Sequence, residues 1–209
     1  MGSAASREYA ESFGVEDQPL AAARARSEEF GCEPVSPAAG GALRFLAAAL
    51  DARAVVEVGT GAGVSGLWLI GGMRADGVLT SVDTEAEHQR AARQSFGEAG
   101  IVAARTRLIN GAALDVLPRL TDSAYDLVFV DGPKAQYQDC LAEALRLLRP
   151  GGVVVFSGVL GRGRVSEPTA RDPETVALRE LVKTIREHEQ LLSTLLPLGE
   201  GLLAAAHRP

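Results

Sequence analysis

The stretch VEVGTGAGVSGLWLI, residues 56–70, joins a β-branched run to an apolar helical pattern through a turn rich in glycine. The run AVVEV at 54–58 has the composition of a buried strand. The helical pattern after the turn carries the only tryptophan of the chain, Trp68, which we expect to lie in the core. Open α/β sheets bind their ligands beyond the carboxyl ends of their strands, so this turn is the first candidate for a binding site.

Strand and helix patterns alternate after this turn. Further strands are expected at 78–83, 106–110, 125–131 and 153–158, and helices at 85–100, 111–120, 134–148 and 172–188. The tail breaks the alternation, because 191–198 and 202–207 have the pattern of two strands joined by a tight turn. This order predicts an α/β fold with a Rossmann-like, doubly wound, mostly parallel sheet of seven strands. Helices would cover both faces, and one strand of the C-terminal hairpin would run antiparallel.

The N-terminal quarter of the chain shows apolar residues at helical spacing only. Two helices are expected there, within 18–32 and 36–52. We therefore expect residues 17–53 to form a helical cap on a single domain that spans 17–209. Residues 1–16 are expected to form a flexible or helical segment in front of it.

A loop rich in glycine, arginine and proline follows the strand expected at 153–158. It covers 161–173, and its composition predicts the least ordered part of the domain. Its arginines, Arg162, Arg164 and Arg171, are open to two interpretations. They are solvated side chains on a mobile loop, or they close over an acidic acceptor.

The bulk composition excludes several classes of partner. An apolar content of 46% and a charged content of 23% are typical of a globular domain with a sizeable core. The net charge is −6 and no basic cluster stands out, so nucleic acid and anionic membranes are not expected as partners. No apolar run approaches about 18 residues, and no secretory signal pattern is visible. We therefore expect a cytoplasmic protein.

Neither the cysteines nor the histidines form a recognisable site. Cys32 and Cys140 have no partner at a metal-binding spacing, so we expect two buried, reduced thiols. None of His88, His188 and His207 stands close to a motif, and all three are expected on the surface.

Taken alone, the glycine turn is compatible with a dinucleotide. Gly61, Gly63 and Gly66 satisfy the spacing G-x-G-x-x-G, and Asp83 ends the next expected strand, where an acidic residue can pair with ribose hydroxyls. An NAD-dependent reductase would also need a catalytic pair such as Tyr-x-x-x-Lys. No lysine stands four positions after Tyr137, which argues against that enzyme class.

Glu57 favours a cationic ligand over a pyrophosphate. It stands two residues before Gly59, where its carboxylate is expected to face the ligand. A like charge at 4 Å would cost about 4 kcal/mol at an effective dielectric constant of 20. An amino acid joined to a nucleoside suits the site better, because backbone N–H groups and Ser65 can bind its carboxylate and Asp83 can bind its ribose. S-adenosylmethionine has this composition and is the expected cofactor, with S-adenosylhomocysteine as its product.

Four motifs together resemble a known family. VVEVGTGAGVSGLWL, LTSVDTEAEH, YDLVFVDGPK and LRLLRPGGVVV are similar to those of the class I S-adenosylmethionine-dependent O-methyltransferases of the catechol and caffeoyl-CoA type. An actinobacterial branch of O-methyltransferases is the most similar. The resemblance extends from about Val35 to the C-terminal hairpin.

The resemblance implies a set of functional residues. Asp131 would face both the methyl end of the cofactor and the acceptor, and Lys134 would act as a base on the acceptor hydroxyl. The residues that it implies for cofactor binding are Val35, Glu57, Gly59, Thr60, Gly61, Gly63, Ser65, Asp83, Thr84, Ala112 and Asp131.

The chain departs from this family where its metal-dependent members bind a divalent cation. Those members combine the acid at position 131 with an adjacent Asp-Asn pair at the end of the following strand. Ser157 and Gly158 stand at the positions of that pair, and Pro133 replaces the second acid of a common Asp-x-Asp motif. One carboxylate does not provide the near-octahedral oxygen coordination that Mg²⁺ prefers, so no metal site is expected.

Two functions remain open on this basis. The first is methyl transfer from S-adenosylmethionine to a hydroxyl oxygen of a small, aromatic acceptor without a divalent metal. The second is a catalytically weak or inactive relative that binds the cofactor as a sensor or assembly partner, which the altered strand end FSGVL at 156–160 favours. The family also implies a homodimer, to which the apolar helices within 17–50 would contribute.

Overall fold

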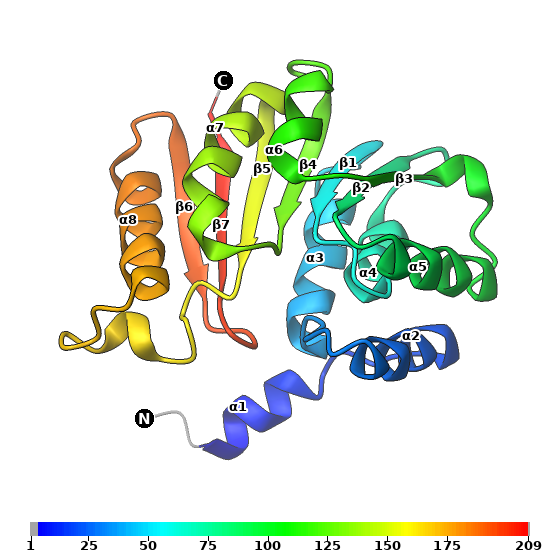
Figure 1. The fold of residues 1–209 in the computed structure, drawn as a ribbon, viewed down its shortest axis with the longest axis horizontal. Helices are drawn as coiled ribbons and strands as arrows, with labels where there is room; N and C mark the ends of the chain where they lie inside the picture. The colour runs from blue at the N-terminus through cyan, green and yellow to red at the C-terminus, as the bar shows by residue number, and fades with distance from the viewer. Residues whose placement is uncertain (1–3, 209) are drawn as a thin grey trace.

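The computed structural model describes residues 4–208 and contains a seven-stranded sheet with helices on both faces (Figure 1). The strands lie in the order β3-β2-β1-β4-β5-β7-β6. β1 to β5 are parallel, whereas β7 is antiparallel to both of its neighbours. The predicted fold class is therefore confirmed, including the reversed strand of the C-terminal hairpin. The strands are β1 (Ala54–Val58), β2 (Val78–Asp83), β3 (Thr106–Asn110), β4 (Tyr125–Val130), β5 (Leu148–Ser157), β6 (Leu191–Leu196) and β7 (Leu202–His207).

The helices cover the sheet from two sides, and α1 extends away from the rest of the molecule (Figure 1). Within residues 4–208, no helix combines the length and the apolar character that a membrane crossing requires. The helices are α1 (Ala4–Glu11), α2 (Gln18–Glu29), α3 (Pro37–Ala49), α4 (Val64–Gly72), α5 (Ala86–Glu98), α6 (Ala113–Val116), α7 (Tyr137–Leu147) and α8 (Pro173–Glu187).

The direction of strand addition changes between β1 and β4. β2 and β3 follow β1 on one side of the sheet, and the chain then crosses back to place β4 and β5 on the other side. β1 and β4 pair in parallel from Val55 opposite Leu127 to Val58 opposite Val130, so their carboxyl ends meet at one edge of the sheet. Such a switch point is where doubly wound sheets form a ligand-binding crevice.

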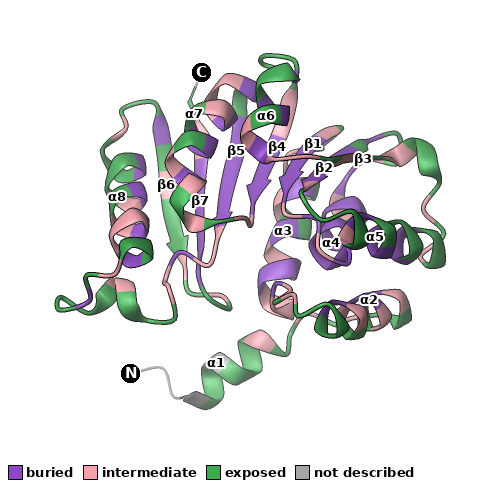
Figure 2. Ribbon diagram, viewed as in Figure 1, coloured by how far each residue is buried: buried purple, intermediate pink, exposed green. Residues whose placement is uncertain are grey.

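The central strands are largely buried (Figure 2), and the alternation of their side chains divides the core into two layers. Val55 and Phe129 belong to the layer against α2, α3, α4 and α5, whereas Val56 and Val128 belong to the layer against α6, α7 and α8. Parallel strands that are covered on both faces have near-continuous apolar sequences, as β4 does here. Trp68 on α4 is 3% exposed, which confirms its predicted place in the core.

The loop that composition predicts to be loose is held by one arginine of α8. The Arg179 guanidinium donates hydrogen bonds to the backbone carbonyls of Arg164, Val165, Glu167 and Ala170. Hydrogen bonds from a charged donor to backbone carbonyls are among the stronger ones in proteins. The composition of the loop itself does not reveal this arrangement, because the arginine that fixes the backbone lies outside the loop.

Candidate active site

Two adjoining cavities open at the carboxyl ends of β1, β2 and β4. The smaller has a volume of about 190 Å³ and is lined by the glycine turn after β1 and by Asp83. The larger has a volume of about 930 Å³ and lies towards β5 and the loop before α8. Glu33, Pro34, Val35 and Asp131 line both cavities. Asp131, which follows β4, therefore lies where the two meet.

The glycine turn depends on backbone conformations that other residues rarely adopt. Gly59 has a φ of +92°, and a Cβ built on it would lie 2.1 Å from the backbone oxygen of Asp131. Gly63 has a φ of +93°, begins α4, and leaves room for Ala92 of α5. These glycines let the turn pass close to the end of β4 and let α4 pack on α5.

Asp83 and the turn hold each other in place. One carboxylate oxygen of Asp83 accepts hydrogen bonds from the backbone N–H groups of Thr60, at 2.9 Å, and Gly61, at 3.0 Å. The other accepts a hydrogen bond from the N–H of Glu85 at 2.9 Å. The Asp83 side chain keeps 10% of its surface exposed, so an oxygen of a fixed carboxylate is presented to the smaller cavity.

Glu57 does not face the cavity, contrary to our expectation. It lies on the same face of β1 as Val55, beneath α4, and its fully buried carboxylate accepts hydrogen bonds from the hydroxyls of Ser65 and Ser81, both at 2.6 Å. Burial raises the pKa of the Glu57 carboxyl to about 7, although these two hydroxyls act in the opposite direction. The electrostatic argument from Glu57 against a pyrophosphate is therefore wrong. Its carboxylate supports the turn from behind.

The structure brings most of the predicted cofactor-binding residues together, although cofactor contact stays a prediction for all of them. Those that line the smaller cavity are Val35, Gly59, Thr60, Gly61, Ser65, Asp83 and Asp131. Those that lie outside its lining are Glu57, Gly63, Thr84 and Ala112. The carbonyl of Thr84 accepts a hydrogen bond from the Asn110 side chain at 2.9 Å, and Ala112 precedes the first turn of α6.

Asp131, Lys134, Tyr137 and Ser157 form a cluster beside the point where the cavities meet: Asp131 lines both cavities, Lys134 and Ser157 line the larger one, and Tyr137 is buried behind them. Lys134 Nζ donates to the Tyr137 hydroxyl at 2.6 Å and to the Ser157 carbonyl at 3.3 Å, and it lies 3.4 Å from the Asp131 carboxylate. The Tyr137 hydroxyl in turn donates to the Ser157 carbonyl at 2.9 Å. Burial raises the pKa of the Asp131 carboxyl, while Lys134 and the Ser157 hydroxyl act in the opposite direction. A nitrogen that donates to three oxygens is an ammonium, so Lys134 supplies a fixed positive charge.

The residues of this cluster do not fit a divalent cation. Gly158 has a φ of +69°, and a Cβ built on it would lie 2.9 Å from Lys134 Nζ, so the ammonium fills the space beside that position. Only Asp131 contributes a carboxylate to the four-residue cluster, and it is already paired with Lys134. A hard cation would meet a like charge and too few oxygen ligands.

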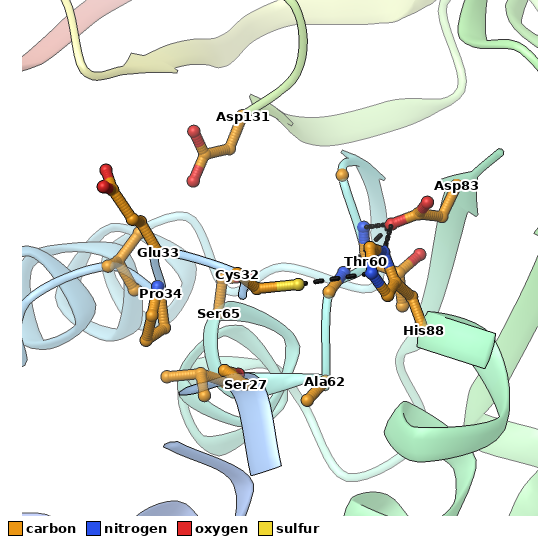
Figure 3. A pocket seen from close by; sticks show the side chains of 14 residues that line it. Ser27, Cys32, Glu33, Pro34, Thr60, Ala62, Ser65, Asp83, His88 and Asp131 are labelled. Carbon is orange, nitrogen blue, oxygen red and sulfur yellow. Dashed lines mark hydrogen bonds and ion pairs between the residues drawn. The ribbon is translucent and has the colours of Figure 1, made fainter. Parts of the chain in front are cut away.

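The sequence did not identify three residues in or directly behind the cleft, Tyr137, His88 and Cys32. Tyr137 stands three positions after Lys134, a spacing that brings side chains together on a helical turn, so a signal for it existed. His88 was expected on the surface, but it is partly buried at the edge of the smaller cavity. Its side chain is 21% exposed, and its ring lies 3.3 Å from both Asp83 and Cys32 (Figure 3). Cys32 is half-buried rather than buried. No sequence pattern links residues this far apart in the chain.

The arginines near the larger cavity already have acidic partners. Arg162 pairs with Glu33 of the cap at 2.6 Å, and both side chains are more than two-thirds exposed, at 71% and 77%. Arg164 pairs with Asp172 at 2.6 Å, next to the start of α8. An acidic acceptor would have to compete with these carboxylates, so the structure gives no support to an anion clamp.

Known proteins share this fold and this sequence pattern. A family described as O-methyltransferase has a sequence model that matches residues 19–208. A protein of Mycobacteroides abscessus named "Putative O-methyltransferase" is 52% identical over 197 residues, which cover 94% of this chain and 92% of its own. The resemblance seen in the motifs is therefore confirmed, including its actinobacterial branch.

Solved structures agree with the sequence relatives. A Corynebacterium glutamicum protein superposes with a TM-score of 0.90 at 33% identity and covers 97% of this chain and 95% of its own. The O-methyltransferase TomG of Streptomyces achromogenes, solved in complex with SAM, superposes with a TM-score of 0.87 at 29% identity, with the same coverage of 97% and 95%. With a family match over nearly the whole chain and a cleft at the expected edge of the sheet, this chain belongs to the O-methyltransferase family.

Proposed function

We propose that this chain transfers the methyl group of S-adenosylmethionine to a hydroxyl oxygen of a small, aromatic acceptor without a divalent metal. The observation that carries the proposal is the Lys134 ammonium beside Asp131, held where the two cavities meet and seated in space that Gly158 leaves open. The nucleoside would occupy the smaller cavity, and the acceptor would approach from the larger one.

The cofactor assignment is supported from two directions. The glycine turn offers backbone N–H groups at the start of α4, and Asp83 offers a fixed carboxylate for ribose hydroxyls. The similar Streptomyces enzyme binds S-adenosylmethionine in its crystal structure. Neither argument depends on Glu57, whose carboxylate lies outside the cavity lining.

The chemistry needs a way to ionise the acceptor. A phenol with a pKa near 10 is ionised to about one part in a thousand at pH 7. Without assistance, forming the phenolate therefore adds about 4 kcal/mol to the barrier. The Lys134 ammonium stabilises the developing oxyanion electrostatically. The Asp131 carboxylate accepts the hydroxyl proton, the oxygen forms its bond to the methyl carbon, and the bond from sulfur to that carbon breaks. This assigns the base role to Asp131, whereas the sequence analysis gave it to Lys134.

A labelled-methyl transfer screen tests the proposal. The acceptors are catechols, simple phenols and flavonoids, each assayed with and without EDTA. Unchanged turnover in EDTA is the expected result. Turnover that EDTA abolishes and Mg²⁺ restores would overturn the metal-free mechanism. Binding of the cofactor without turnover on any of these acceptors would favour the sensor or assembly role.

Variants of Lys134 separate its two possible roles. Lys134→Met is expected to lower turnover by about 100-fold while cofactor affinity stays the same. Lys134→Arg keeps the positive charge but is no base at neutral pH, so it should retain most of the activity that Met loses. Lys183→Met, at an exposed position on α8, is the matched control. An arginine variant as inactive as the methionine variant would return the base role to Lys134.

We also propose that the chain forms a homodimer through its N-terminal helices. Phe45 on α3 is a large apolar side chain that the monomer leaves exposed, and Tyr9 on α1 and Phe13 and Val15 in the connection to α2 are exposed as well. The proposal requires these side chains to form one continuous apolar patch, because contiguous patches rather than single exposed residues are typical of interaction surfaces. A monomeric mass in light scattering at micromolar concentration would refute the dimer. The cytoplasmic location also stays a prediction.

A further inference from the structure

A hydrogen-bonded chain of three side chains lines the smaller cavity on the side away from Asp131 (Figure 3). Cys32 Sγ lies 3.3 Å from His88 Nε2, and His88 Nδ1 lies 3.3 Å from Asp83 Oδ2. The chain joins the cap, which carries Cys32, to the end of β2. The ring of Phe30, also in the cap, packs edge-on against the imidazole, with the ring centroids 6.0 Å apart.

The direction of these hydrogen bonds follows from the Asp83 carboxylate, which can only accept, so His88 Nδ1 carries the proton between them. Burial raises the pKa of the Cys32 thiol, and the negative charge of Asp83 raises it further, so the thiol keeps its proton at neutral pH. In the neutral imidazole Nε2 is then the acceptor nitrogen, to which the Cys32 thiol can donate. The remaining ring proton lies on Nδ1 and points at Asp83. Asp83 and Cys32 therefore favour the same tautomer, in which the Nδ1–H of His88 donates beside the carboxylate that lines the smaller cavity.

A ribose diol needs both acceptors and donors. Each hydroxyl donates one hydrogen bond, which a carboxylate can accept, but each oxygen also has lone pairs that a carboxylate cannot serve. The N–H groups of Thr60, Gly61 and Glu85 are at 2.9 to 3.0 Å from Asp83 and are directed at its carboxylate. His88 makes the longest contact with that carboxylate, at 3.3 Å, and its side chain is partly exposed to the cavity.

We propose that Asp83 and His88 act as an acceptor–donor pair that recognises the ribose hydroxyls of the cofactor, with Cys32 helping to fix the donor nitrogen of His88. The inference rests on the proposed function, since it assumes a nucleoside in the smaller cavity. His88 contacts the ligand directly, whereas Cys32 is a positioning residue that acts through the imidazole.

Calorimetric titration with two ligands tests the pair. One is S-adenosylhomocysteine and the other is its analogue that lacks both ribose hydroxyls. His88→Leu is expected to lower the affinity for S-adenosylhomocysteine by about tenfold, which corresponds to one lost hydrogen bond. The affinity for the analogue should fall by less than about twofold. His88→Asn, whose amide can donate from near the Nδ1 position, should recover most of the loss.

Cys32 supplies a second comparison with the same ligands. Cys32→Ala removes the thiol donor and should lower the affinity for S-adenosylhomocysteine by about threefold. Cys32→Ser keeps a donor and should bind this ligand nearly as tightly as the wild type. His188→Leu, at the C-terminal end of α8 and outside the lining of both cavities, is the control for losing a histidine. Melting temperatures of the ligand-free variants report any general loss of structure.

The outcomes are separable. If His88→Leu weakens both ligands equally, or neither, the acceptor–donor pair is overturned while the cofactor assignment stands. If the wild type binds the two ligands equally, the site does not recognise the ribose and the pair is overturned as well. If the wild type binds neither ligand, the proposed function itself fails.

Discussion

At the cofactor end of the cleft, backbone amides hold a single carboxylate, whereas at the acceptor end side chains hold one another. Asp83 is fixed by the N–H groups of Thr60 and Gly61, but Lys134 is fixed by Asp131 and Tyr137. A site formed by backbone amides requires unusual φ angles and close packing of backbone segments, so glycine is its signature in the sequence. A site made of side chains can change its chemistry without any change of fold. The glycine-rich motif that carries the family resemblance lies at the first end, whereas Ser157 and Gly158 stand at the second end where the resemblance implies an Asp-Asn pair.

The largest expected effect lies in the backbone of the cofactor end. Gly59→Ala should lower the free energy of unfolding by about 4 kcal/mol, because the new methyl group would overlap the Asp131 carbonyl and φ is left-handed. Gly61→Ala is the matched control, since its Cβ meets open space, and about 1 kcal/mol is expected from its φ alone. Urea denaturation measures both. Equal losses would show that close approach to β4 is not what Gly59 provides.

The next effect is a pH dependence from Glu57, behind the same turn. Its pKa in the folded protein is about 7, above the usual 4.5, so the folded state keeps a proton that the unfolded chain loses between these values. Stability should therefore fall as the pH rises from about 4.5 to about 7, by about 3 kcal/mol in total.

Glu57→Gln isolates this contribution, because the amide can still bond both Ser65 and Ser81 but does not titrate. Urea denaturation from pH 5 to pH 8 should give a flatter stability profile for the variant than for the wild type. Parallel profiles would mean that Glu57 is ionised in the folded protein at pH 5.

A smaller effect is expected from the acceptor end. Gly158→Asn puts a side chain where the Lys134 ammonium lies, while asparagine tolerates the left-handed φ of +69°. Turnover should fall by about tenfold because the ammonium is displaced, and cofactor affinity should not change. Gly163→Asn has a similar φ of +82° and open space around it, so activity should be kept. Loss of cofactor binding in Gly158→Asn would show that the two ends of the cleft are not independent.

The smallest effect is expected from the Arg162–Glu33 pair at the mouth of the larger cavity. Exposed ion pairs contribute little to stability because water and salt screen them. Arg162→Ala should leave the melting temperature unchanged and alter the KM of a neutral acceptor by less than about twofold. A large rise in KM would instead make this arginine part of acceptor recognition.

The sequence predicted the strands and the turn because each has a local signature. β1 and β2 were expected at the residues where they occur, and Gly59 was identified as part of a turn at the end of a strand. The cofactor was inferred from Glu57 for a reason that the structure contradicts. Because Glu57 and Val55 are two residues apart on one strand, they share a face, and that face is covered by α4. The alternation of the strand already contained this information.

Contacts between distant parts of the chain could not be predicted in the same way. His88 meets Cys32 across 56 positions, and nothing in either segment indicates the other. The acceptor end is intermediate, because the sequence placed Ser157 and Gly158 at the end of a strand beside the site, but the contacts of Tyr137 required the structure. Local periodicity identifies elements, whereas the meeting of elements decides which side chains do chemistry.

Arg179 holds the backbone of the loop beside the larger cavity through hydrogen bonds to its carbonyls. The conformation of this loop therefore does not depend mainly on the loop's own side chains. Side chains of this loop that line the cavity, such as Arg162 and Arg164, can then be exchanged while the backbone beneath them keeps its conformation. A change of acceptor preference could then come from side-chain substitutions alone, without an insertion in the loop and without a loss of its backbone order. A combinatorial library confined to these positions is the natural starting point for redirecting this enzyme.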